Sequence, residues 1–283
     1  MTAAADDNRA LALTSVRLRM RLLHTIARAG AGHTGGGLSC MDILSVLYHR
    51  VLNVAPERVN DPTRDRYVQS KGHAVEALYV VLADRGFFPW SELDTLCTYQ
   101  SPFVGHPTRK VPGIEMNTGA LGHGLAICTG MALAAQLDGT AYRTVTLLGD
   151  GELAEGSNWE ACMAAAHYKL DNLTAIVDHN TLQISGHTRE VCSNEPLDDK
   201  FRAFGWCVRH VDGHDIAALR GALTAPPEAG QPLCVIAHTI KGKGVSFMEG
   251  DASWHHRVPT DDELQRALRE LEHAAAALQG EQR

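Results

Sequence analysis

The protein has 283 residues, of which 45% are hydrophobic and 21% are charged, and its formal net charge is −7. This length allows a sizeable buried core in one large α/β domain or two small ones, and we expect a single domain over residues 1–283. The acidic balance argues against nucleic acid as a partner, and no apolar run approaches the roughly 20 residues of a membrane span.

The seven cysteines are odd in number, widely spaced and without a CxxC pair. This usage indicates reduced thiols and argues against a disulfide framework or a structural zinc site. Residues 1–13 contain two early acids and lack the basic-then-apolar pattern of a secretory signal. Together these features predict a cytoplasmic protein.

The first predicted element is an amphipathic helix over about residues 8–29, in which aliphatic residues recur at helical spacing. The glycine-rich residues 30–37 are predicted to form a flexible loop that presents His33, and a second helix is expected over residues 38–51. Because these glycines follow a helix and no GK[ST] is present, we exclude dinucleotide-loop and P-loop interpretations.

Residues 64–74 are predicted to form a short strand that turns at Gly72 into a helix over about residues 74–84. Lys71 and His73 lie at this turn, where a helix N-terminus favours anions. A phosphate site and a solvated charged turn fit these residues about equally well.

A long loop is expected over residues 101–119, which are rich in proline and glycine and carry His106. A glycine turn then runs into an apolar helix ending near residue 137. Several histidines lie beside glycines, and as a set they indicate a site, although a surface role stays open for each one. They are His33, His73, His106, His123 and His214.

The stretch Thr144–Leu182 is predicted to form a strand, a helix and a second strand. A crossover between parallel strands would bring Asp150, after the first strand, and Asn180, after the second, to one sheet edge, where such sheets bind ligands. Their oxygens suit Mg²⁺ or Ca²⁺, and the glycines on either side of Asp150 admit an anion. A metal-diphosphate site and a structural turn both remain open from this stretch alone.

The remaining segments are a polar loop over 183–195, strands over 206–211 and 233–237, and helices over 215–223 and from about 260 onward. The last helix begins with Thr260 and Glu263 at the spacing of a capping box.

In chain order, these segments resemble the N-terminal, diphosphate-binding half of the transketolase family. The matching motifs are GHTGGGLS (32–39), DRYVQSKGHA (65–74), GHP (105–107), TGALGHG (118–124), GDGELAEG (149–156), VDHN (177–180), KGKGVSF (241–247) and Trp254-His255. As an ordered set they are specific. The resemblance implies an α/β fold, with a mostly parallel sheet flanked by helices, of the thiamine-diphosphate-binding type.

The resemblance also implies thiamine diphosphate and a divalent metal as cofactors, with Mg²⁺ expected and Ca²⁺ or Mn²⁺ as alternatives. The implied metal ligands are Asp150, the side chain of Asn180 and the carbonyl of Leu182. Other implied cofactor contacts are His73, Gly119, Ala120, Leu121, Gly151, Asn180, Lys241 and His255, with Glu155 in an acidic network that couples paired sites. The implied catalytic residues, which would face the sugar, are His33, His106 and His255.

Three positions depart from the family pattern, namely Gly36, His123 and His256. The chain also ends before the pyrimidine-binding and C-terminal domains of a full-length transketolase, so we expect a separate subunit to supply them in an α2β2 assembly. The implied reaction transfers a two-carbon ketol unit from a ketose, or a ketose phosphate, to an aldose. The alternatives are the α subunit of a 2-oxo acid dehydrogenase, which the GHT, SKGHA and GHP motifs disfavour, and a non-catalytic scaffold.

Overall fold

The computed structural model describes residues 3–280, so both ends of the predicted domain, residues 1–2 and 281–283, lie outside the described part. The helices are α1 (Ala3–Ala29), α2 (Thr34–Val46), α3 (Val75–Asp84), α4 (Gly124–Leu137), α5 (Gly156–His167), α6 (Thr188–Val191), α7 (Leu197–Ala203), α8 (Ile216–Thr224) and α9 (Asp261–Gly280). The strands are β1 (Arg66–Gln69), β2 (Thr144–Gly149), β3 (Leu173–His179), β4 (Leu182–Gln183), β5 (Gly186–His187), β6 (Cys207–Asp212) and β7 (Leu233–His238).

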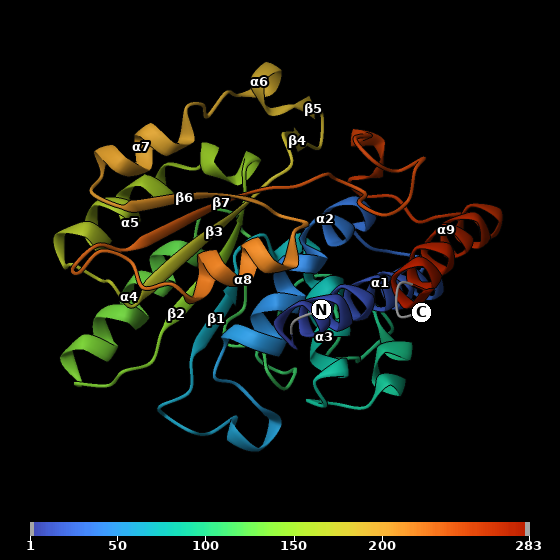
Figure 1. Ribbon diagram of the computed structural model, residues 1–283, viewed down its shortest axis with the longest axis horizontal. Coiled ribbons are helices and arrows are strands. Elements are labelled where there is room, and N and C mark those ends of the chain that lie inside the picture. Colours follow the sequence, from blue (N-terminus) through green and yellow to red (C-terminus); the bar gives the residue numbers. More distant parts are fainter. Residues whose placement is uncertain (1–2, 281–283) are drawn as a thin grey trace.

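Five strands form one parallel sheet in the order β1-β2-β3-β7-β6, and β4 and β5 form a separate antiparallel hairpin (Figure 1). Neighbouring residues along each buried strand face opposite layers, because side chains alternate across a strand. Leu147 of β2 packs into the core with α1, α2, α3 and α8, whereas Leu148 packs into the core with α4, α5 and α7. The sheet is therefore covered by helices on both faces, as expected for a parallel sheet.

The first and last helices, α1 and α9, pack against each other (Figure 1). At the start of α9, the Glu263 backbone N–H donates to Thr260 Oγ1 at 3.3 Å and the Thr260 backbone N–H donates to the Glu263 carboxylate at 2.9 Å. This is the predicted capping box. None of the helices within residues 3–280 is long and apolar enough to cross a bilayer.

The prediction of a flexible loop through Gly37 is wrong, because α2 already begins at Thr34. Gly35 and Gly37 are helical and buried, and they allow close approach of neighbouring groups: a Cβ at Gly35 would lie 2.9 Å from the Trp254 carbonyl oxygen, and one at Gly37 would lie 3.0 Å from Leu22. His33 is consequently held at the N-terminus of a packed helix and not on a mobile loop.

The predicted polar loop over residues 183–195 is also partly wrong. The segment contains most of the β4–β5 hairpin and the short helix α6, and α7 follows without having been predicted. These elements are too short for hydrophobic periodicity to reveal them. The other predicted strands and helices are confirmed within a few residues.

Candidate active site

A cavity of about 460 Å³ lies at the carboxyl edge of the sheet. Most of the predicted site residues line it, namely His33, His73, His106, Gly119, Leu121, Asp150, Gly151, Asn180, Leu182, Lys241 and His255. Ala120 and Glu155 are exposed and do not line it. Lys71 and Gly149, which the sequence placed at candidate anion sites, also line it, and the lining residues that the sequence did not single out are Glu152, Gln183, Ile184 and Ser185.

Two adjacent parallel strands bring the predicted metal ligands together. Gly149 at the end of β2 is paired with Asp178 near the end of β3, so Asp150 and Asn180 emerge at the same edge. Asp150 accepts hydrogen bonds from the backbone N–H groups of Gly151, at 2.8 Å, and of Thr181. The Asn180 side-chain oxygen accepts one from the Leu182 N–H at 3.1 Å.

These hydrogen bonds occupy only some of the lone pairs of the Asp150 carboxylate and the Asn180 amide oxygen, because a carboxylate has about four acceptor positions and an amide oxygen has two. The remaining lone pairs suit a hard cation. Burial, reinforced by the nearby Asp178 carboxylate, raises the pKa of Asp150 to about 6. Within residues 3–280, no three His, Cys, Asp or Glu side chains are grouped to hold a metal by themselves. A cation here would therefore take mixed carboxylate, amide and carbonyl ligands and need further oxygens from an anion.

Two lysines supply positive charge to the same cavity. The Lys71 ammonium is fully buried; burial opposes its charged form, but the Asp178 carboxylate holds the pKa of Lys71 above its usual value. Lys241 donates to the Leu182 carbonyl at 3.3 Å and lies 3.1 Å from Nδ1 of His255. Burial, followed by the charge of Lys71, lowers the pKa of Lys241 to about 8. This end of the cavity suits an anion.

Four histidines also line the cavity, and one of them, His255, lies beside Lys241. The His33 ring centroid lies 5.3 Å from that of His73, 6.2 Å from that of His106 and 5.5 Å from that of His255. Burial is the largest cause that lowers the pKa of each ring, to about 4 for His33 and about 3 for His255. At pH 7 these imidazoles are neutral, so each can donate one hydrogen bond and accept another, as proton transfer and hydroxyl binding require.

Two further histidines of the predicted set lie elsewhere. His123 is exposed at the start of α4. His214 Nδ1 lies 2.8 Å from Asp42, while its Nε2 accepts a hydrogen bond from the Ile240 N–H at 2.9 Å. His214 thus supports the backbone next to Lys241 but is not among the residues that line the cavity.

The cavity fits thiamine diphosphate with a divalent cation by the chemistry of its donor set. Oxygen donors suited to a hard cation lie at the ends of β2 and β3, and Lys71 and Lys241 line the same cavity. Gly151 has no side chain to cover the backbone beside Asp150. Its volume lies within the few hundred to about 1,000 Å³ typical of small-molecule sites.

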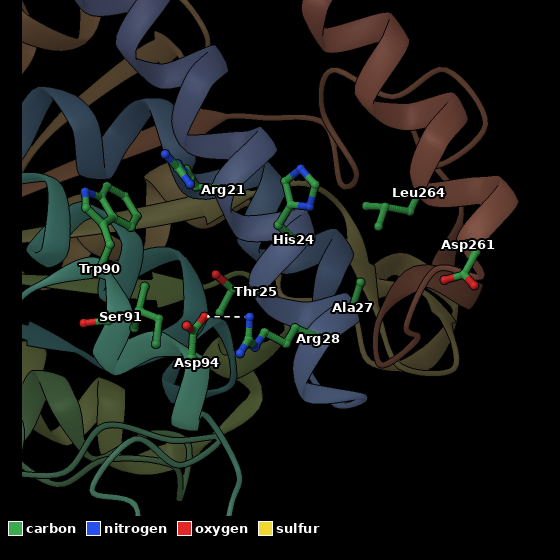
Figure 2. Close-up of a pocket in the computed structure, with 11 residues that line it drawn as sticks. Arg21, His24, Thr25, Ala27, Arg28, Trp90, Ser91, Asp94, Asp261 and Leu264 are labelled. Atoms are coloured by element: carbon green, nitrogen blue, oxygen red, sulfur yellow. Dashed lines mark ion pairs between the residues drawn. The ribbon is translucent and has the colours of Figure 1, made fainter.

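A larger hollow of about 660 Å³ lies between α1, the 3₁₀ turn Trp90–Thr95 and the start of α9 (Figure 2). Its charged side chains are exposed, and three of them have neighbours: Arg28 pairs with Asp94 at 3.2 Å, and the Arg21 guanidinium lies 5.1 Å from the centre of the Trp90 ring. None of the predicted site residues lines it. The chemistry therefore points to the cavity at the sheet edge.

Comparisons with known proteins show which family the chain is similar to. The family description "Transketolase, thiamine diphosphate binding domain" matches residues 11–276. The chain is 48% identical to a subunit of apulose-4-phosphate transketolase from Phocaeicola vulgatus, over 96% of this chain and 97% of the relative. It is 42% identical to the 6-deoxy-6-sulfo-D-fructose transketolase subunit SqwG from Clostridium sp., over 92% of this chain and 95% of the relative.

Longer transketolases match over part of their length. Human transketolase is 37% identical over 93% of this chain but only 42% of its own. The crystal structure of transketolase from Campylobacter jejuni superposes with a TM-score of 0.87 at 30% identity, over 93% of this chain and 43% of that chain. A Pichia stipitis transketolase in complex with sedoheptulose 7-phosphate gives a TM-score of 0.84 at 27% identity, over 96% of this chain and 45% of that chain. The chain thus spans less than half the length of these solved and human transketolases.

Proposed function

The chain belongs to the transketolase family, matching its thiamine-diphosphate-binding domain, and from this we propose that it is the diphosphate-binding subunit of a two-subunit transketolase. In this proposal, residues 1–283 form one thiamine-diphosphate-binding domain. The observation that carries the proposal is the convergence, in one cavity, of hard oxygen donors, buried lysines and neutral histidines.

The metal ligands proposed are Asp150, Asn180 and the Leu182 carbonyl, and the metal proposed is Mg²⁺, with Ca²⁺ or Mn²⁺ as alternatives. The geometry supports these roles because Asp150 and Asn180 follow the ends of adjacent strands and line the same cavity as Leu182. The proposed diphosphate contacts are the His73 imidazole, the backbone of Gly151 and the Lys241 ammonium, all of which line the cavity.

Gly119 and Leu121 line the cavity and are proposed to border the cofactor ring, together with the Ala120 backbone. Glu155 lies outside the cavity and is proposed to act in coupling to a second site. When bound, thiamine diphosphate would supply the carbanion chemistry that breaks the bond beside a ketose carbonyl.

His33, His106 and His255 are proposed to bind substrate hydroxyls and to move protons during transfer. Their rings line the cavity and are neutral at pH 7, because burial lowers the pKa of each. A neutral imidazole can take a proton from a hydroxyl and return it, whereas an imidazolium cannot accept one.

The proposed substrate is a ketose with an anionic terminal group, from which a two-carbon unit passes to an aldose. Two relatives that match this chain over nearly their full length are named for apulose 4-phosphate and 6-deoxy-6-sulfo-D-fructose. Both are named as subunits, which supports a separately encoded pyrimidine-binding partner. We propose an α2β2 complex located in the cytoplasm.

The test is an assay of the complex assembled from this chain and its partner against ketose phosphates and, separately, against 2-oxo acids. Metal-dependent ketose cleavage with transfer to an aldose is expected. Decarboxylation of 2-oxo acids without ketose cleavage would instead favour a dehydrogenase-type enzyme. Cofactor binding without either activity would favour a scaffold.

A further inference from the structure

The turn that follows the 3₁₀ segment Ala252–Trp254 is fixed from two sides. Thr34 at the start of α2 donates a hydrogen bond to the Arg257 carbonyl. The Arg257 guanidinium lies 4.1 Å from the centre of the buried Trp254 ring and pairs with Glu263 at the start of α9. The backbone that carries His255 and His256 is therefore held in place by two helices.

His256 occupies a defined position in this turn, against a residue of the cavity. Its ring centroid lies 4.5 Å from that of His33, which is closer than the other imidazoles that contact His33 within the described residues. His256 is exposed, whereas His33 is partly buried and lines the cavity. The histidine cluster thus continues from the cavity to the surface through this pair.

The His256 ring is free to take a ligand. Within residues 3–280, neither of its nitrogens has a hydrogen-bond partner. The adjacent cation, Arg257, is already engaged by Trp254 and Glu263. An imidazole can offer a bound ligand a hydrogen-bond donor, a hydrogen-bond acceptor or, when protonated, a positive charge.

We propose that His256 is a specificity-determining residue that contacts the solvent-facing part of the sugar and packs against His33. This inference rests on the proposed function and names one determinant of its substrate. In this proposal, a ketose whose carbonyl lies inside the cavity extends the rest of its hydroxylated chain outward past His33. The oxygen atoms of that chain, or of its terminal phosphate, then come within reach of the His256 ring.

A first experiment tests the contact in the isolated chain, independently of catalysis. The histidine ring resonances are recorded by NMR for the wild-type chain, for His256→Ala and for the control His273→Ala, which removes an exposed imidazole from α9. The His33 ring signals are expected to move in His256→Ala and to stay in place in His273→Ala. Unmoved His33 signals in His256→Ala would overturn the proposal.

A second experiment tests specificity in the assembled two-subunit enzyme with fructose 6-phosphate and fructose as probes. His256→Ala is expected to raise KM for the ketose about tenfold, with kcat changed less than about twofold, because one hydrogen bond to bound sugar is lost. His256→Gln should recover part of the affinity, and His273→Ala should match the wild type. Thiamine diphosphate affinity should be unchanged in all three variants.

The two sugars identify the group that is contacted. A larger loss with fructose 6-phosphate assigns the contact to the phosphate, and equal losses assign it to the hydroxyls. Unchanged KM values for both sugars in an enzyme that turns over would overturn the specificity role. A wild-type complex without any ketose cleavage would contradict the proposed function, while the NMR measurement would still decide the contact.

Discussion

Lys71 and Asp178 form an ion pair inside the protein, with side chains that are only 2% and 0% exposed. The Lys71 ammonium also donates to the Gly36 carbonyl at 3.2 Å, and Asp178 accepts hydrogen bonds from Ser39 and Thr239. The pair joins the turn after β1 to the end of β3 and the first turns of α2. The ion pair therefore holds these three segments, which surround the cavity, in fixed positions relative to one another.

Removing either charge of this pair should destabilise the fold strongly. Lys71→Met leaves the Asp178 carboxylate buried without its cation, and we expect a loss of about 3–5 kcal/mol in the free energy of unfolding. Urea denaturation measures it. The matched control is Arg28→Ala, which breaks the exposed Arg28–Asp94 pair and should cost less than about 1 kcal/mol. Equal losses in the two variants would contradict a stabilising role for the buried pair.

Adjacent glycines of α2 should respond oppositely to alanine. Gly35→Ala places a Cβ 2.9 Å from the Trp254 carbonyl oxygen, so the turn carrying His255 must shift, at a cost of roughly 1–3 kcal/mol. Gly36→Ala meets His73 and Lys71 at an ordinary 3.7 Å and should be neutral or stabilising by up to about 1 kcal/mol, through better helix propensity. Thermal unfolding of both variants measures the two changes in stability. Similar destabilisation of both would refute the packing explanation.

Glu76 is expected to make the stability of the protein depend on pH. It is 1% exposed, neither carboxyl oxygen has a well-formed hydrogen bond, and burial raises its pKa from 4.5 to about 8. Between these values the unfolded chain releases a proton that the folded chain keeps, so this residue lowers stability as pH rises, by up to about 1.4 kcal/mol per pH unit. Above the folded-state pKa the effect levels off.

The variant Glu76→Gln lacks this titration. Its advantage in unfolding free energy over the wild type should grow from pH 5 to pH 8, by a few kcal/mol in order of magnitude. Chemical denaturation at several pH values measures the difference. Parallel stability curves for the two proteins would show that Glu76 titrates normally.

The metal assignment predicts a selective loss of cofactor binding. Asp150→Ala removes a carboxylate from the proposed metal set, and thiamine diphosphate affinity in the assembled complex should fall at least about 10–100-fold in the presence of Mg²⁺. Calorimetric titration with and without Mg²⁺ measures it. Asp199→Ala, on the exposed side of α7, serves as the control. Unchanged metal-dependent affinity in Asp150→Ala would remove Asp150 from the metal site.

The central part of the site could be predicted because its residues follow strand ends. The rule that parallel strands present their carboxyl ends at one edge is enough to bring Asp150 and Asn180 together, although they are far apart in sequence. The place of His33, His73 and His106 beside glycines indicated a site, and the resemblance of the motifs to a known family added His255; all four line the cavity.

Other features depend on tertiary packing that local sequence does not encode. The glycines of α2 suggested a loop, because low helix propensity cannot reveal that Trp254 and Leu22 require their small size. The pairing of Lys71 with Asp178 spans 107 residues of sequence, and no spacing rule connects them. Glu76 lies in an otherwise apolar helix segment, where an isolated acid gives no signal of complete burial.

The most direct test of the two-subunit enzyme is a ketol-transfer assay on the purified chain, by itself and after mixing with its partner, with thiamine diphosphate and Mg²⁺ present throughout. We predict no transfer by the chain alone and metal-dependent transfer from a ketose phosphate to an aldose by the mixture. Robust turnover by the chain alone would contradict the proposed division of the active site between two polypeptides.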